Sequence, residues 1–295
     1  MQLDRLRAAI LAIKAAQPDE TYQLSLKEKI ARIRLAFKRD WYDHHAAEAR
    51  QLASILKKGY PTPVLTVCGH GTQEIRFTSY LAYFLNPHSG HGLSNRVLNF
   101  VLGEYVPELL DLPTEKIRVN SEVWIGKAQV NKVTRNCICD ICVNTDNLAV
   151  FIENKITSGQ GIVKGAGRQL ELYNLAIENN QEFSGKKILK IYLTPTGKLP
   201  IGVNDWEPMS YAEVVTRSAN LLGDPELSDV AKENLRRFLV DLSLGPNEES
   251  DELLDSVYSL TRDALGDFNL SAVSRYLKMV NDNRMLINIL LEGLR

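Results

Sequence analysis

Two short apolar segments carry charged side chains at positions where a buried strand normally has Val, Ile or Leu. They are CICDICVN (137–144), which contains Asp140, and LAVFIENKI (148–156), which contains Glu153 and Lys155. Their β-branched residues and the polar turn between them predict two strands of one antiparallel hairpin. Unpaired charges are unfavourable in buried strands, so these three side chains are expected to have a specific function.

The spacing of these charges predicts a metal site. Side chains alternate between the faces of a strand, so Glu153 and Lys155 point to the same face, about 7 Å apart. In the predicted hairpin Asp140 lies beside Glu153, and two such carboxylates repel each other unless a cation lies between them. Mg²⁺ binds carboxylates, water and substrate phosphate. The pattern therefore predicts metal-assisted hydrolysis of a phosphodiester, with Lys155 contacting phosphate or water.

The surrounding residues predict a mixed α/β core. RVNSEVWIG (118–126) and ILKIYLTP (188–195) have the composition of further strands, and the helical pattern over 168–179 supplies a crossover between strands. Gln169 and Tyr173 are four residues apart, so they share one face of this helix. An amide and a phenol in this arrangement can brace the lysine and contact phosphate.

Helical patterns flank this core on both sides. The glycine and prolines of KKGYPTP (57–63) mark a boundary. We therefore expect a helical N-terminal extension at 1–60, the α/β core at 61–220 and a helical C-terminal region at 221–295. Helices within these regions are expected at 3–58, 72–85, 93–106 and 228–244.

Composition and charge narrow the class of protein. The chain of 295 residues is 44% apolar and 24% charged, which is typical of a globular protein and not of a disordered one. It has no apolar stretch of membrane-spanning length, no secretory signal pattern and no disulfide framework, so we expect a cytoplasmic protein. The net charge is +5 over 116–198 and −6 over 221–295. The basic balance of the core suits a polyanion.

Three clustered cysteines offer a different interpretation. Cys137, Cys139 and Cys142, with one more cysteine or histidine, suggest a zinc-stabilised interaction protein. Structural zinc sites usually have two Cys-x2–4-Cys knuckles separated by a longer spacer, which this segment lacks. Buried cysteine behaves as a small apolar residue, and this is the interpretation we favour. His88 and His91 are expected to shape the loop before the next helix.

The order of Asp140, Glu153-Asn154-Lys155 and Gln169-Leu-Glu-Leu-Tyr173 resembles the signature of the PD-(D/E)XK nuclease superfamily. Its Gln-x-x-x-Tyr element resembles that of the RecB-like branch. RFTSYLAYFLNPHSGHG, followed by IENKI, IYLTPTG and MSYAEVV, is similar to a bacterial group known mainly as uncharacterised or defence-associated. The resemblance covers about residues 72–220. One departure is Cys139, which stands before Asp140 where the pattern has proline.

This resemblance implies a restriction-endonuclease-like sheet flanked by helices and a Mg²⁺-dependent nuclease, with Mn²⁺ as a substitute metal. It implies that Asp140 and Glu153 bind the metal and that Lys155 acts on the attacking water and the phosphate. Glu74 resembles the upstream acidic metal ligand of many members, and Glu122 is its competitor.

The resemblance also bears on substrate and partners. It implies nucleic acid as substrate, with DNA favoured over RNA, and by analogy alone a role in antiviral defence. The alternative is a catalytically silent nucleic-acid-binding or scaffold protein on the same fold, although such proteins usually lose at least one of the three charged residues. No membrane association is expected. The acidic helices of 221–295 are expected to mediate homo-oligomerisation or to contact a partner protein.

Overall fold

The computed structural model describes residues 20–59, 63–130, 133–156, 162–163, 167–245 and 250–292. They form two compact units. The smaller joins the residues up to Lys58 to Asp255–Asp282, and the larger joins Gly59–Leu254 to the residues from Asn283 onward. No helix within the described ranges is both long enough and apolar enough to cross a membrane.

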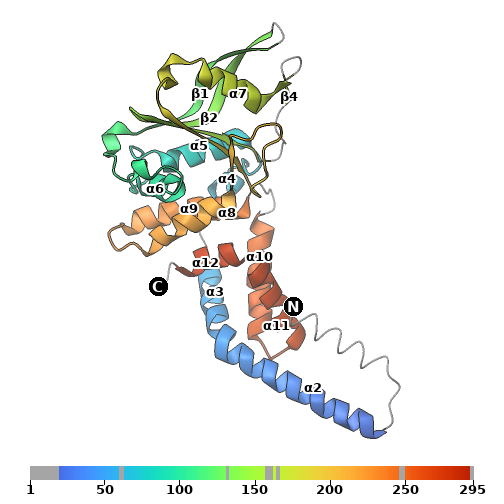
Figure 1. Cartoon of the computed structure of the whole chain (residues 1–295). Helices are drawn as coiled ribbons and strands as arrows, with labels where there is room; N and C mark the ends of the chain where they lie inside the picture. The colour runs from blue at the N-terminus through green and yellow to red at the C-terminus, as the bar shows by residue number, and fades with distance from the viewer. Residues whose placement is uncertain are drawn as a thin grey trace. The chain divides into compact units, whose positions relative to one another are not determined.

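A five-stranded mixed sheet forms the centre of the larger unit (Figure 1). The order of its strands is β1-β2-β3-β6-β7, with β1, β2 and β3 antiparallel and β3, β6 and β7 parallel. The strands are β1 (Arg118–Val130), β2 (Val133–Asn144), β3 (Leu148–Asn154), β6 (Lys187–Thr194) and β7 (Glu207–Ser210). The predicted mixed α/β core is therefore confirmed.

The register of the β2–β3 hairpin agrees with the sequence prediction. Ile141 pairs with Ile152, and Cys142 pairs with Phe151. Continuing this register by one residue places Asp140 opposite Glu153. The helix α7 (Gln169–Glu178) then connects β3 to the parallel strand β6, as predicted for a crossover.

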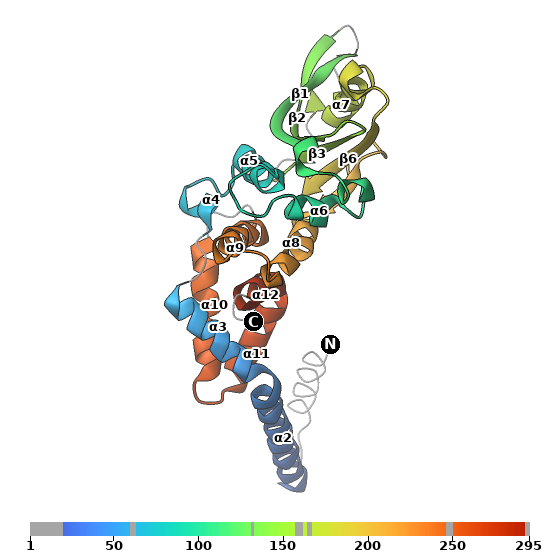
Figure 2. The same cartoon turned by 90° about the vertical axis from the view of Figure 1, so that its left-hand side faces the viewer.

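Helices cover both faces of the sheet. Two views show α7 on one side of β1 and β2, and α5 (Glu74–Leu85) on the other (Figures 1 and 2). Gly126 allows α7 to pack closely, because a Cβ at this position would lie 3.0 Å from the Ala176 carbonyl oxygen. Below α7, the rings of Phe151 and Phe183 pack edge to face at 4.9 Å.

The other helices of the larger unit pack mainly on one another and on α5. Phe84 of α5 stacks on Phe238 of α9, with ring centroids 4.3 Å apart. The α-helices are α4 (Val64–Val67), α6 (Arg96–Leu102), α8 (Tyr211–Ala219), α9 (Asp229–Leu244) and α12 (Arg284–Glu292). The 3₁₀ turns are η2 (Pro107–Leu109), η3 (Thr114–Lys116), η4 (Gln181–Phe183) and η5 (Asn220–Gly223).

The structure corrects two expectations for this unit. The helix expected over 93–106 is α6 alone and ends at Leu102. Gly103 follows it, at a position where a Cβ would lie 2.5 Å from the Asn99 carbonyl oxygen, and Pro107 comes soon after. The strand β7 and the two-residue strands β4 (Ile162–Val163) and β5 (Gly167–Arg168) were not predicted.

The smaller unit is helical. It contains α2 (Glu20–Asp40), the π-helical turn η1 (Trp41–His45), α3 (Ala46–Lys58), α11 (Leu270–Asp282) and most of α10 (Ser250–Leu265). Trp41 is buried, and its ring packs edge to face on Tyr276 at 5.4 Å. The helical prediction is confirmed over residues 20–58, and its part at 3–19 lies outside the described residues.

Candidate active site

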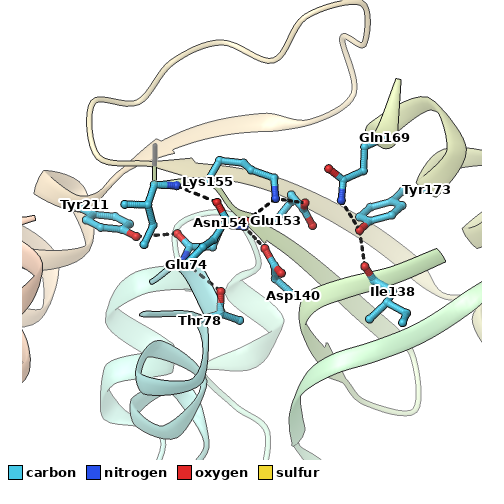
Figure 3. A network of polar contacts seen from close by, with 11 residues as sticks. Glu74, Thr78, Ile138, Asp140, Glu153, Asn154, Lys155, Gln169, Tyr173 and Tyr211 are labelled. Carbon is cyan, nitrogen blue, oxygen red and sulfur yellow. Dashed lines mark hydrogen bonds and ion pairs between the residues drawn. The ribbon is translucent and has the colours of Figure 1, made fainter. Parts of the chain in front are cut away.

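The predicted carboxylates meet where β2 and β3 run side by side (Figure 3). Asp140 lies in β2 and Glu153 near the end of β3. The Asn154 amide donates a hydrogen bond of 2.7 Å to Asp140 Oδ2, which ties the two strands together at this point. Glu153 is only 1% exposed. The predicted proximity of the two acidic side chains is therefore confirmed.

Lys155 is held by two carboxylates. Its Nζ atom donates a hydrogen bond of 2.7 Å to Glu74 Oε1 and lies 3.0 Å from Glu153 Oε1. Glu74 is the first residue of α5, and its other oxygen accepts a hydrogen bond of 3.3 Å from the Ile156 amide. This helix therefore positions the lysine directly above the end of β3 (Figure 3).

The two upstream acidic candidates lie in different surroundings. Glu74 contacts Lys155 directly, as described above. Glu122 is exposed on β1, has a φ of 52°, and affects Asp140 through its charge, which raises the pKa of that carboxyl. The structure therefore places Glu74 within the cluster and Glu122 at its edge.

The carboxylate of Glu153 has no hydrogen bond on either oxygen from any described residue. Its close approach to Lys155 lacks hydrogen-bond geometry, although it is an ion pair by distance. A buried carboxylate without hydrogen bonds is unfavourable, and such groups in native proteins usually await a partner. A divalent cation is a suitable partner, because carboxylate oxygens are its preferred ligands.

Burial also shifts the proton equilibria of the two acids. Burial, then the nearby charge of Asp140, raise the pKa of Glu153 to about 8 against the attraction of Lys155. Burial raises the pKa of Asp140 to about 6. Burial lowers the pKa of Lys155, but the charges of Glu153 and Glu74 outweigh this effect and raise it. Without a cation, the pair of acids therefore retains a proton near neutral pH.

The three predicted metal ligands do not converge on one point where all three could bind the same metal ion. Among the described residues, no three His, Cys, Asp or Glu side chains are close enough to hold a metal ion together. Glu74 is separate from the two other acids because its carboxylate accepts a hydrogen bond from Lys155. Mg²⁺ commonly binds through one or two carboxylates and completes its shell with water, so Asp140 and Glu153 fit it as a pair.

Gln169 and Tyr173 bond to each other, as their helical spacing predicts. The Gln169 amide donates to the Tyr173 hydroxyl at 2.7 Å, and this hydroxyl donates to the Ile138 carbonyl oxygen. Neither side chain hydrogen-bonds Lys155 within the described part of the chain, so the expected brace of the lysine is wrong. The pair instead anchors α7 to β2, two residues before Asp140 (Figure 3).

Sequence analysis missed the buried network around the Asn154 side chain. This amide donates to Thr78 Oγ1 at 3.2 Å and accepts from the Tyr211 hydroxyl at 2.8 Å. Asn154 and Thr78 are fully buried, and Tyr211 is 2% exposed. The network ties the end of β3 to α5 and α8. The one signal in the sequence was an amide between Glu153 and Lys155 in an apolar strand.

The clustered cysteines lie in the core, as the favoured interpretation predicts. Cys137, Cys139 and Cys142 are all buried. The thiols of Cys137 and Cys139 donate to the carbonyl oxygens of Leu172 and Ile152, at 3.6 and 3.5 Å. Burial raises the pKa of Cys142 to about 12, which favours the neutral thiol over the metal-binding thiolate.

The two histidines shape the loop after α5, as predicted. His91 is buried, and its Nδ1 accepts a hydrogen bond of 2.9 Å from the Leu93 amide. Its Nε2 lies 2.9 Å from the Asn86 carbonyl oxygen. The His88 ring lies 3.1 Å from the Ile117 carbonyl oxygen. His91 therefore acts within the loop itself, whereas His88 ties the loop to the residue that precedes β1.

Comparison with known proteins agrees with this geometry. Residues 63–241, more than half of the chain, match the PD-(D/E)XK nuclease superfamily. No curated protein and no solved structure is significantly similar to the chain. The match contains the whole sheet and the cluster of Glu74, Asp140, Glu153 and Lys155, and the predicted restriction-endonuclease-like fold is thereby confirmed. The chain therefore belongs to the PD-(D/E)XK nuclease superfamily.

Proposed function

We propose that the protein is a metal-dependent nuclease that hydrolyses phosphodiester bonds, with Mg²⁺ as its metal and Mn²⁺ as a substitute. The observation that carries this proposal is the Glu153 carboxylate. It is 1% exposed and has two oxygens without hydrogen bonds, and it lies beside a second carboxylate and a lysine. A divalent cation satisfies these oxygens, and a lysine at this distance suits a phosphate.

In this proposal Asp140 and Glu153 hold the metal. A bound divalent ion would polarise the phosphate and lower the pKa of its water. Lys155 stabilises the negative charge that develops on the phosphate, and Glu74 keeps its ammonium group in place. We retain Glu74 rather than Glu122 as the upstream carboxylate of the site, because Glu74 already contacts Lys155.

Gln169 and Tyr173 have a supporting role in this proposal. Their hydrogen bonds hold the carbonyl of Ile138, and Asp140 follows two residues later on the same strand. They therefore hold the strand that carries Asp140 against α7. Burial raises the pKa of Tyr173, so its hydroxyl stays a proton donor over the physiological range.

Several finer points belong to the same proposal. We infer that DNA is preferred over RNA and that the protein acts in the cytoplasm in defence against foreign DNA, as the resemblance to the bacterial group suggests. The nuclease core would span 61–220, between a helical extension at 1–60 and helices at 221–295 that mediate homo-oligomerisation or contact a partner protein. The alternative is a catalytically silent nucleic-acid-binding or scaffold protein. The intact Asp140, Glu153 and Lys155 favour the nuclease.

Cleavage of supercoiled plasmid, linear duplex, single-stranded DNA and RNA tests the proposal, each with Mg²⁺, Mn²⁺ or EDTA. Lys155→Ala should abolish metal-dependent cleavage. Lys190→Ala is a matched control, because Lys190 is equally buried (12% against 11% side-chain exposure) and forms an ion pair with Asp205. The control should cleave as the wild type does. Absence of cleavage by the wild type on every substrate would contradict autonomous nuclease activity and favour the silent alternative.

A further inference from the structure

α5 covers only part of the β1–β2 face opposite α7, and the area around Trp124 and Ile138 that the described elements leave uncovered is called the open face below. α7 packs on the other face, where Gly126 approaches the Ala176 carbonyl and the Cys137 thiol lies 3.6 Å from the Leu172 carbonyl oxygen. On the open face, Trp124 and Ile138 are neighbours across the two strands. They are 54% and 46% exposed, although both are large and apolar.

Trp124 differs sharply from the other tryptophans of the chain. Trp41 and Trp206 are 1% and 2% exposed, so the fold buries both of them almost completely. Burial of an aromatic side chain is favourable, and an exposed one beside a second apolar residue indicates a contact surface. The exposed ring of Trp124 therefore calls for a partner with a flat apolar face.

This open face continues into the proposed active site. The carbonyl of Ile138 accepts the Tyr173 hydrogen bond, and Asp140 lies two residues further along the same strand. Two residues of a strand span about 7 Å. Glu122, two residues before Trp124, lies between the pairs Ser121–Ile141 and Val123–Cys139 and is therefore opposite Asp140. A ligand whose phosphate lies at Asp140 can therefore place a neighbouring group on Trp124.

A positively charged side chain without an ion-pair partner in the described part of the chain lies on the same face as Trp124 and Ile138. Lys127 pairs with Asn136, which is two residues before Ile138 and so on the same face; Lys127 is exposed and has no ion-pair partner among the described residues. Lysine and arginine contact phosphates, whereas aromatic rings stack on bases. An exposed tryptophan on the same face as an unpaired lysine suits a nucleic-acid strand better than an apolar protein surface.

We propose that this face binds an unpaired base, which stacks on Trp124 beside the phosphate to be cut. The position of that phosphate rests on the proposed function. Stacking on a side chain requires an open base face, which the interior of a duplex lacks. The substrate class is therefore a single strand, or the single-stranded end or flap of a duplex, and not a continuous double helix.

Tryptophan fluorescence tests this proposal directly. The full chain carrying Lys155→Ala is titrated with single-stranded oligothymidylate, single-stranded RNA of the same length, and a blunt duplex. Saturable quenching should appear with single strands at lower concentrations than with the duplex. Trp124→Phe in the same background should remove the quenching, because Trp41 and Trp206 are buried. Equal quenching by single-stranded DNA and RNA would still support stacking and would show that the site does not distinguish deoxyribose from ribose.

Affinity provides the second measurement. Trp124→Ala should weaken binding of a labelled single strand roughly 5- to 100-fold in fluorescence anisotropy, since stacking on one base contributes that range. Trp124→Phe should weaken it less, because phenylalanine retains a stacking face. Val230→Ala is the control, since it trims an even more exposed apolar side chain (70%) on α9 and should leave the affinity unchanged.

Two outcomes would overturn the inference. One is wild-type affinity of Trp124→Ala for single strands with no change in emission, and the other is equal or tighter binding of blunt duplex. These results differ from a failure of the nuclease proposal. Quenching by single strands without any cleavage by the wild type would reject the nuclease and retain the stacking site. Cleavage by Trp124→Ala at the wild-type rate would retain the nuclease proposal and reject the stacking site.

Discussion

Two buried carboxylates in the larger unit have opposite surroundings. Asp241 in α9 and Glu153 in β3 are each 1% exposed. The Asp241 oxygens accept hydrogen bonds from the amides of Val64 and Leu65, at 2.8 and 3.1 Å. The Glu153 oxygens accept none from the described residues. Burial alone therefore does not distinguish a structural acid from a functional one.

The difference lies in what the fold supplies to each group. Asp241 joins α9 to the first turn of α4, so its hydrogen bonds are part of the folded chain and its role is structural. Glu153 has only an ammonium group nearby and a second acid beside it. Burial raises the pKa of both acids, to about 8 for Glu153 and about 7 for Asp241, so the contrast lies in the hydrogen bonds. A buried acid that its own protein leaves without hydrogen bonds is prepared for a ligand from outside.

The largest expected effect is on catalysis, in Glu153→Gln. This change keeps the size of the side chain and removes its charge, so metal-dependent cleavage should fall about 10³-fold or more. The free energy of unfolding should stay the same or rise, because an acid without hydrogen bonds is removed from the core. Cleavage assays and thermal unfolding measure the two effects. A large loss of stability would show that Glu153 is a structural acid like Asp241.

The second effect is on pH dependence. With a pKa of about 8, Glu153 must lose its proton before a cation can bind. The apparent affinity for Mg²⁺ should therefore rise by about tenfold per pH unit between pH 6 and pH 8. Calorimetric titration at several pH values measures this, and an affinity that is constant over this range would contradict the retained proton.

The same raised pKa predicts the opposite trend for stability without metal. The folded state holds a proton on Glu153 that the unfolded chain has already released above about pH 4. The free energy of unfolding measured in EDTA should therefore fall as the pH rises toward 8. Glu153→Gln serves as the control, since its side chain does not titrate and its curve should be flatter.

The third effect is on stability, in Asp241→Ala. The amides of Val64 and Leu65 would lose their acceptor, so the free energy of unfolding should fall by about 1–3 kcal/mol. Cleavage at a temperature where the variant is folded should remain within a few-fold of the wild type. Asp241→Asn, which keeps one acceptor oxygen, should lose less. Urea unfolding measures the loss, and a catalytic defect in folded Asp241→Ala would remove the distinction between the two acids.

The smallest effect is expected for Tyr211→Phe. It removes the hydrogen bond to the Asn154 side chain, which contributes about 1 kcal/mol. Because Asn154 also donates to Asp140, kcat should fall a few-fold while KM stays unchanged. Tyr80→Phe removes a hydroxyl that does not contact Asn154 and should leave both constants unchanged. Equal effects of the two variants would show that the Asn154 network does not position the acids.

Much of the site was predictable because its information is local. Asp140, Glu153 and Lys155 interrupt apolar strands within one hairpin, and the alternation of a strand together with a short turn brings them together. Gln169 and Tyr173 bond each other because they are one helical turn apart. Their shared target, the carbonyl of Ile138, is 35 residues away from Tyr173 and was not predictable.

The sequence-based predictions of the fold failed where local patterns are weak. The strand β7 has the sequence EPMS, which contains a proline and has no apolar alternation, and it pairs with β6 at the edge of the sheet. The helical pattern over 93–106 continues past Gly103, but α6 ends at Leu102, where Gly103, a poor helix former, is followed by Pro107. Tertiary packing decides the first case.

The sequence by itself determined the mixed sheet, the β2–β3 hairpin and the meeting of two acids with a lysine, because strand period and short turns act over a few residues. Only the tertiary structure decided which other groups form hydrogen bonds with these site residues. Glu74 reaches Lys155 across 81 residues, and Tyr211 reaches Asn154 across 57. Hydrogen bonding and exclusion of water depend on the whole assembled unit. For this reason only the fold shows that Asp241 is hydrogen-bonded and that Glu153 is not, among the described residues.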